Sequence, residues 1–138
     1  MEKRFSALAH ELATRDRDLG PGLEDARQGA RRLRAHAAGC IAEFAAAATS
    51  CWAPHLAEIE VGSVEPDEKH VDCIQFKVRR GRFEIVCVAK AKGKVTLVGP
   101  YKRGKSEKPC RDFALEGEAV LGTLEDLLVE LITAASQR

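Results

Sequence analysis

Residues 73–98 read CIQFKVRRGRFEIVCVAKAKGKVTLV, and this stretch decides the fold class. Apolar and polar side chains alternate along most of it with a period of two, which is typical of β-strands rather than helices. Gly81 and Gly93 each stand among basic residues between two such runs and predict tight turns. The stretch therefore predicts three antiparallel strands joined as a meander.

The positions of the two turns set the register of these strands. We place the first turn at Arg80-Gly81, which sets Arg79 opposite Arg82, and the second at Lys92-Gly93. The predicted core face then carries Ile74, Phe76, Val78, Phe83, Ile85, Cys87, Ala89 and Val98. The middle of the other face carries Val86, Val88, Val95 and Leu97. We expect a helix or a partner subunit to cover part of this second face, because a sheet face that meets water alternates more cleanly.

Helical periodicity is found on both sides of the strands. Residues 1–20 have apolar residues at helical spacing, and the following Gly20-Pro21-Gly22 predicts a break. A long second helix is predicted over residues 21–52, with a seam of mostly small side chains at alternating spacings of three and four. This seam predicts packing on another helix, on the sheet or on a second copy of the chain. Its residues are Leu23, Ala26, Ala30, Leu33, Ala37, Cys40 and Phe44.

The whole pattern predicts a single domain of 138 residues in the α+β class. Two N-terminal helices precede an antiparallel meander of about four or five strands over residues 55–115. A last apolar helical stripe predicts a C-terminal helix over residues 117–136, packed on the sheet.

Several features predict a cytoplasmic protein. The N-terminal residues MEKRFSALAHELATRDRDL carry charges throughout, unlike a secretory signal. The most apolar segment, residues 35–53, is rich in alanine and interrupted by polar residues, so we expect no membrane span. The five cysteines show no tight pairing pattern, which favours reduced thiols.

The net charge of +1 conceals two oppositely charged parts of the chain. Residues 69–111 contain 13 basic and 3 acidic side chains, a net charge of +10, whereas the remainder contains 9 basic and 18 acidic ones, a net charge of −9. The balanced total excludes a uniformly basic protein, but it is compatible with a basic binding face.

The basic segment contains the predicted binding residues. In the predicted register, like charges at Arg79 and Arg82 oppose each other, which is unfavourable unless an anion or an acidic group relieves it. Arginine can hold a phosphate or a carboxylate by two parallel hydrogen bonds. The predicted anion-binding or partner-binding residues are Lys77, Arg79, Arg80, Arg82, Lys102, Arg103 and Lys105. The alternative is that charged strand ends only prevent sheet edges from aggregating.

Motifs that would name a reaction are missing from the sequence, including a P-loop, a dinucleotide fingerprint, a nucleophile elbow and HExxH. Cys51 with His55, and His70 with Cys73, are spaced like zinc ligands, but the two cysteines are expected on the helix seam and in a strand. Cys110 has basic neighbours and no assignable histidine partner. We therefore expect no cofactor, no metal site and no catalytic residue.

Three functions follow as hypotheses. The leading one is a non-catalytic cytosolic binding or adaptor module, homodimeric, whose basic strand ends and 101–109 loop engage an acidic protein or a nucleic acid. Nucleic acid is the less favoured partner, because Tyr101 is the only aromatic residue of the basic segment that we expect to be exposed. The second is a structural or chaperone-like homodimer that uses apolar surfaces. The third is a small-molecule-binding or enzymatic domain with a pocket between sheet and helices.

Overall fold

An antiparallel sheet of six strands, with two long helices on one side of it, makes up the computed structural model, which describes residues 2–67, 70–104 and 108–136. The helices are α1 (Glu2–Ser50), the 3-10 helix η1 (Pro54–Ala57) and α2 (Ala119–Ser136). The strands are β1 (Glu60–Val61), β2 (Glu65–Pro66), β3 (Cys73–Arg80), β4 (Phe83–Lys90), β5 (Lys94–Lys102) and β6 (Cys110–Ala114). Their order is β1-β3-β4-β5-β6, and β2 also pairs with β3. The predicted α+β class, with N-terminal helices, an antiparallel sheet and a C-terminal helix packed on it, is confirmed.

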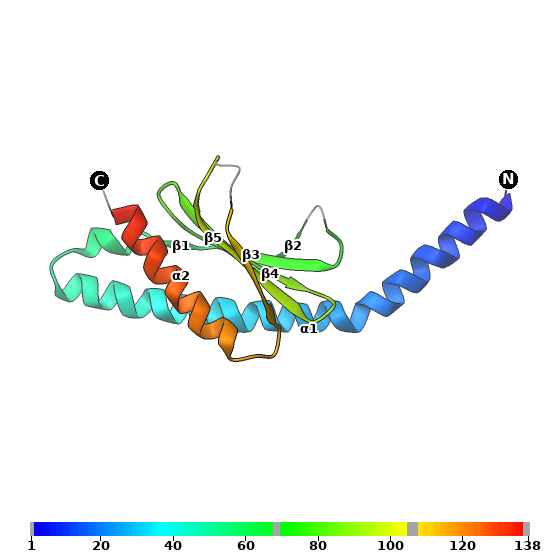
Figure 1. The fold of residues 1–138 in the computed structure, drawn as a ribbon, viewed down its shortest axis with the longest axis horizontal. Helices are drawn as coiled ribbons and strands as arrows, with labels where there is room; N and C mark the ends of the chain where they lie inside the picture. Colours follow the sequence, from blue (N-terminus) through cyan, green and yellow to red (C-terminus); the bar gives the residue numbers. More distant parts are fainter. Residues whose placement is uncertain (1, 68–69, 105–107, 137–138) are drawn as a thin grey trace.

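Both α1 and α2 pack on the same face of the sheet (Figure 1). The core lies between these helices and strands β3, β4 and β5, and its largest fully buried side chains include Phe76, Leu33, Ile85, Leu97, Leu124 and Leu131. We call the opposite face of the sheet the open face, because no helix within the described ranges packs on it.

The predicted seam of α1 is part of this core. Ala26, Ala30, Leu33 and Ala37 are fully buried, while the remaining seam residues, Leu23, Cys40 and Phe44, are half-buried. The small side chains let the helix backbone approach the sheet closely. The seam thus packs within the chain, as the sheet-packing alternative predicted.

The predicted break after residue 20 is wrong, since α1 runs without interruption from Glu2 to Ser50 with Pro21 inside it. Proline removes one intrahelical hydrogen bond, and a helix can accommodate this loss by bending. Figure 1 shows such a bend where the blue N-terminal part of α1 leaves the rest of the molecule. Gly22 serves another purpose than ending a helix: a Cβ atom here would collide with the backbone carbonyl of Ala91. The second helix before the sheet is η1.

The turn between β3 and β4 lies one residue later than predicted. Arg80 pairs with Phe83, so the turn residues are Gly81 and Arg82, and Gly81 adopts a φ of +58°. Glycine tolerates this left-handed conformation, whereas a bulky side chain at that position would be strained. The shift keeps the predicted faces of both strands, but it places Arg79 opposite Glu84 instead of Arg82.

The turn between β4 and β5 has three residues, 91–93, rather than the predicted two, because Lys90 pairs with Lys94. A slip of one residue turns every side chain of a strand to the other face. Leu97 and Val95 are therefore buried in the core, whereas Val98, which we predicted in the core, lines the open face.

A bulge between Glu84 and Val86 changes the register again near the end of β5, so that Tyr101 lies opposite Glu84. Bulges of this kind redirect side chains at the edge of a ladder. Tyr101 consequently lines the open face instead of the core face that Val95 and Leu97 occupy.

Two further findings bear on the sequence predictions. Among the described residues, no helix is both long and apolar enough to cross a membrane. All five cysteines carry free thiols; Cys73 and Cys87 are buried, and Cys51 and Cys110 are exposed.

Candidate binding surface on the open face

The open face contains a hollow of about 810 Å³ between β2 and the residues just before β6. Lys77 and Lys108 contribute its positive charges, and Glu65 and Asp67 its negative charges. The remaining lining residues are Pro66, Gln75, Val86, Val98 and Tyr101. The hollow thus has a partly apolar floor with charged groups around it, an arrangement suited to holding an extended polar ligand.

Glu84 lies at one end of this floor, with only 4% of its surface exposed. Its Oε1 accepts a hydrogen bond from Arg79 Nε at 2.5 Å, and its Oε2 accepts one from the Tyr101 hydroxyl. A buried carboxylate needs such partners, because it loses its hydration on folding. The network therefore balances the negative charge of Glu84 with that of Arg79 and holds the Tyr101 and Arg79 side chains in place.

The pKa values of these groups follow from the network. Burial by itself would raise the pKa of Glu84, but the hydrogen bonds from Tyr101 and Arg79 and the charges of Arg79 and Lys77 outweigh it and lower the pKa. Burial, and then the hydrogen bond to Glu84, raises the pKa of Tyr101. At neutral pH, Glu84 is thus ionised and Tyr101 is a neutral donor.

Three exposed cations meet at the end of the sheet beside the β3–β4 turn, and we call Arg82, Lys102 and Arg103 the cationic end. Lys102 lies opposite Phe83, and the Arg103 N–H donates to the Arg82 carbonyl at 2.7 Å. Arg103 Nη2 also donates to the carbonyl of Gly81 at 2.7 Å. The backbone pairing of β4 with β5 thus brings together charges that are far apart in the sequence.

Two smaller hollows connect the cationic end to the large one. Lys77 lines both the large hollow and a second one of about 210 Å³. Arg79 lines that second hollow and also a third one of about 390 Å³, which reaches Arg103. Glu58 and Glu60 line the third hollow as well and equal its two arginines in number. The three hollows are thus neighbours that share lining residues.

The opposite end of the sheet carries another group of lysines, Lys90, Lys92 and Lys94. The negatively charged Asp112 lies near these lysines, and its carboxylate accepts a hydrogen bond from the Thr96 hydroxyl at 2.6 Å. The hydrogen bond from Thr96, followed by the charges of these lysines, lowers the pKa of Asp112. This lysine group thus has a carboxylate of the chain beside it, as Arg103 of the cationic end has Glu58 and Glu60.

The predicted binding residues have different roles in the structure. The opposed pair Arg79 and Arg82 does not exist, since Arg79 forms an ion pair with Glu84. Arg80 donates to the backbone carbonyl of Leu56 and so joins β3 to η1. Lys77 lines the large hollow, Arg82, Lys102 and Arg103 form the cationic end, and Lys105 lies outside the described residues. Tyr101, which was expected to be exposed, is buried, with an exposed fraction of only 8%.

Sequence reasoning missed two features. One is the Glu84–Tyr101 contact, which depends on a bulge at Gly99-Pro100 of β5; a glycine and a proline inside a strand were the usable signal. The other is a group of potential metal ligands among the described residues, His36, Cys40 and Glu125. The spacing of four between His36 and Cys40 on a predicted helix was a usable signal, but Glu125 comes from the far end of the chain.

Cys110 lies in a groove of about 660 Å³ between α2 and strands β5 and β6. The groove is also lined by Asp126 and Glu130, and no histidine belongs to its described lining. A cysteine nucleophile needs a neighbouring base, and although Arg111 also lines the groove, the described lining offers no histidine for this role. This groove is the feature nearest to the predicted pocket between sheet and helices.

Comparison with known proteins gives no match to a protein family, to a curated protein or to a solved structure.

Proposed function

We propose that the chain is a non-catalytic, cytoplasmic binding module that holds an acidic segment of another protein along the open face. The supporting observation is that Arg82, Lys102 and Arg103 lie together at one end of the sheet, where Arg103 lines the third hollow. Within the described part of the chain, none of the three forms an ion pair. Exposed like charges repel one another, and an acidic partner relieves that repulsion.

The large hollow supports binding rather than catalysis. Lys77 and Lys108 stand on its sides, and Val86 and Val98 form an apolar part of its floor. Its described lining contains no cysteine, serine or histidine, so it offers no pair of nucleophile and base of the common kinds. An extended segment with carboxylates near Lys77 and the cationic end, and an apolar side chain over the valines, fits this surface.

An acidic protein segment fits better than a nucleic acid. Proteins that bind single strands stack bases on exposed aromatic rings. Tyr101 is buried and held by Glu84, and the ring of Phe76 belongs to the core. Among the described residues of the open face, no exposed aromatic side chain accompanies the cations. Positive charge remains, and it suits a carboxylate-rich partner.

The experiment is a binding titration with two labelled probes, a polyglutamate peptide and a single-stranded oligonucleotide, between ~50 and ~200 mM salt. We expect the peptide to bind and its affinity to fall with salt, because the contacts are exposed and screened. Tighter binding of the oligonucleotide than of the peptide would indicate that the partner is a nucleic acid and not a protein segment. Binding of neither probe would overturn the proposal.

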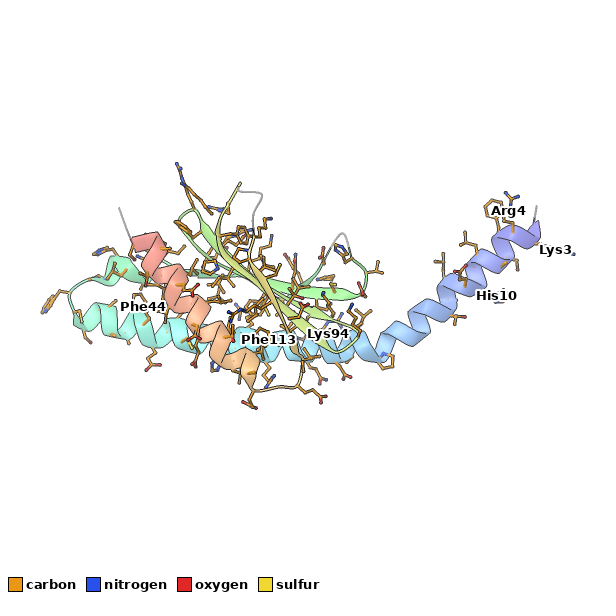
Figure 2. All side chains as sticks on the ribbon, in the orientation of Figure 1. Lys3, Arg4, His10, Phe44, Lys94 and Phe113 are labelled. Atoms are coloured by element: carbon orange, nitrogen blue, oxygen red, sulfur yellow. The ribbon has the colours of Figure 1, made fainter. Side chains whose placement is uncertain are left out.

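A second proposal concerns a homodimer formed through the N-terminal part of α1. This part projects away from the sheet, and Figure 2 shows Lys3, Arg4 and His10 on it, far from the other elements. Phe5, Leu8 and Leu12 remain 65%, 47% and 48% exposed and repeat at spacings of three and four. Such a stripe on a solvated helix is typical of a two-helix contact.

A second copy of the same helix is the partner that matches this stripe in length and spacing. Burying six such side chains stabilises a dimer by at most ~9–18 kcal/mol, and association costs ~4–15 kcal/mol. We therefore expect a weak dimer that depends on concentration. Sedimentation of the wild type, Leu8→Glu and the control His10→Glu on another face of the helix tests this. A monomeric wild type, or a dimer that Leu8→Glu leaves intact, would contradict the proposal.

A further inference from the structure

We propose that His36 and Cys40 of α1, together with Glu125 of α2, form a binding site for Zn²⁺ that links the two helices. The site lies on the helical side of the sheet, away from the open face, and does not depend on the proposed binding function. The site uses neither of the two Cys–His pairs noted in the sequence, Cys51 with His55 and His70 with Cys73.

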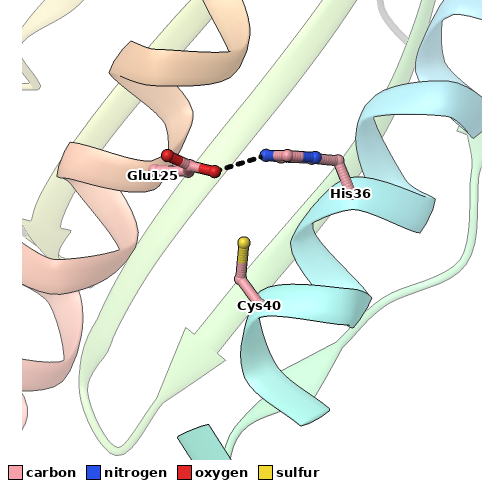
Figure 3. Close-up of side chains that lie close together, drawn as sticks. All are labelled: His36, Cys40 and Glu125. Atoms are coloured by element: carbon pink, nitrogen blue, oxygen red, sulfur yellow. Dashed lines mark hydrogen bonds and ion pairs between the residues drawn. The ribbon is translucent and has the colours of Figure 1, made fainter. Parts of the chain in front are cut away.

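The geometry of the three side chains carries this inference. His36 and Cys40 are four residues apart on one helix and thus project from the same side of it. His36 Nε2 lies 2.9 Å from Glu125 Oε1, and the ligand atoms of all three residues lie within 4.8 Å of one another. Figure 3 shows the Cys40 sulfur pointing toward the His36–Glu125 contact.

A tetrahedral zinc ion fits between these atoms after a small adjustment. Zn–N, Zn–O and Zn–S bond lengths place the ligand atoms ~3.3–3.6 Å apart around the ion. The His36–Glu125 contact must open slightly, and the other separations must close by on the order of 1 Å at most. His36 and Glu125 are on the surface, with 32% and 52% of their side chains exposed, so rotation of these side chains is unhindered by the core.

The donor set has the chemistry that Zn²⁺ prefers. A thiolate, a neutral imidazole and a carboxylate are its ordinary protein ligands, and imidazole and thiolate together disfavour Mg²⁺ and Ca²⁺. On binding, the Cys40 thiol releases its proton to solvent, and the thiolate and Glu125 together balance the charge of the ion. Glu43, one turn beyond Cys40, adds further negative charge near the thiol.

Three protein ligands leave the fourth position of the ion to water, since the site opens to solvent on the side of Glu125. The direct consequence is a stronger cross-link between α1 and α2, which already contact each other through His36 and Glu125. Because the ion binds the folded arrangement and not the separated helices, it raises the stability of the fold.

The test is a titration of the whole chain with Co²⁺ in place of Zn²⁺, followed by displacement with Zn²⁺. We expect one equivalent of Co²⁺ to give a thiolate-to-cobalt charge-transfer band and tetrahedral d–d bands. Cys40→Ser should abolish the charge-transfer band and weaken binding by ~100-fold or more, since the loss of a mere supporting contact to a ligand costs ~10–100-fold. Glu125→Gln, at an exposed position, should weaken binding without affecting the fold.

Cys51→Ser is the matched control, because Cys51 is an exposed thiol directly after the end of α1, with His55 four residues on. It should leave the spectrum and the affinity unchanged. Zn²⁺ should also slow alkylation of Cys40 in the wild type, which mass spectrometry measures residue by residue, while alkylation of Cys110 stays the same. The proposal is overturned if the band persists in Cys40→Ser, if it disappears in Cys51→Ser, or if no band forms.

Discussion

Arg79 of β3 and Glu84 of β4 lie directly opposite each other, with Arg79 Nε 2.5 Å from Glu84 Oε1. The carboxylate is buried, whereas the guanidinium reaches the surface. A buried carboxylate is stable only if hydrogen-bond donors replace its lost hydration, and Arg79 and Tyr101 do this together. One of the cations that the sequence predicted for a partner therefore stabilises the sheet itself.

Glu84→Gln should lower the free energy of unfolding by about 2–3 kcal/mol, because it removes the charge that both donors address. Chemical denaturation measures this. Asp112→Asn is the matched control, since Asp112 also accepts a hydrogen bond across neighbouring strands but is exposed. We expect the control to stay close to the wild type, and an equal loss in both variants would contradict the role of burial.

The same network predicts a dependence of stability on pH. The pKa of Glu84 lies below its ordinary value of 4.5 in the folded chain, so its contribution is complete above pH 4.5 and is lost as the pH falls through the folded value. Urea unfolding at several pH values should show that the free energy of unfolding falls more steeply toward acid pH in the wild type than in Glu84→Gln. Identical slopes would show that Glu84 is not stabilised as a carboxylate.

The register of β5 gives a third prediction. Leu97 is buried in the core and Val98 lines the open face. Leu97→Thr should lower the free energy of unfolding by about 3 kcal/mol, because it creates a cavity and buries a hydroxyl. Val98→Thr should cost less than about 1 kcal/mol. A two-residue turn at Lys92-Gly93 would give the opposite order.

The sequence alone predicts the strands, the C-terminal helix and the packing seam of α1, because each depends on a periodicity that survives small local errors. The length of a turn, in contrast, does not follow from periodicity. Gly93 marks the second turn in either register, and only the contacts of the folded sheet decide that Lys90 pairs with Lys94. A one-residue uncertainty at a glycine then moves a whole strand to the wrong face, as it did for Val98.

Two glycines of α1 provide a fourth prediction. Gly39 has open space where a Cβ would stand, so Gly39→Ala should raise the free energy of unfolding by about 0.5–1 kcal/mol through helix propensity. Gly22 lies against the carbonyl of Ala91, and Gly22→Ala should lower it by about 1–3 kcal/mol. Thermal unfolding distinguishes the two. Equal stabilisation by both would mean that α1 does not approach the β4–β5 turn.

The candidate binding surface was less predictable than the fold. The charge count located the basic segment, but it could not tell which cations bind within the chain, as Arg79 and Arg80 do. Hydrogen-bond partners such as Glu84 and the Leu56 carbonyl are fixed by register and by the path of η1. The zinc ligands required knowledge that α2 crosses α1 near His36, which no local pattern contains.

The central proposal is that Lys77 and the cationic end together hold an acidic segment. The most direct measurement compares the affinity for labelled polyglutamate of two triple variants that lower the net charge equally. One carries Glu at Lys77, Arg82 and Lys102, and the other carries Glu at Lys90, Lys92 and Lys94.

We expect the first variant to bind on the order of 100-fold more weakly than the wild type, and the second to bind within about threefold of it. Circular dichroism should show that both remain folded. Equal weakening by the two variants, or none by the first, would contradict the proposal that this face is the binding surface.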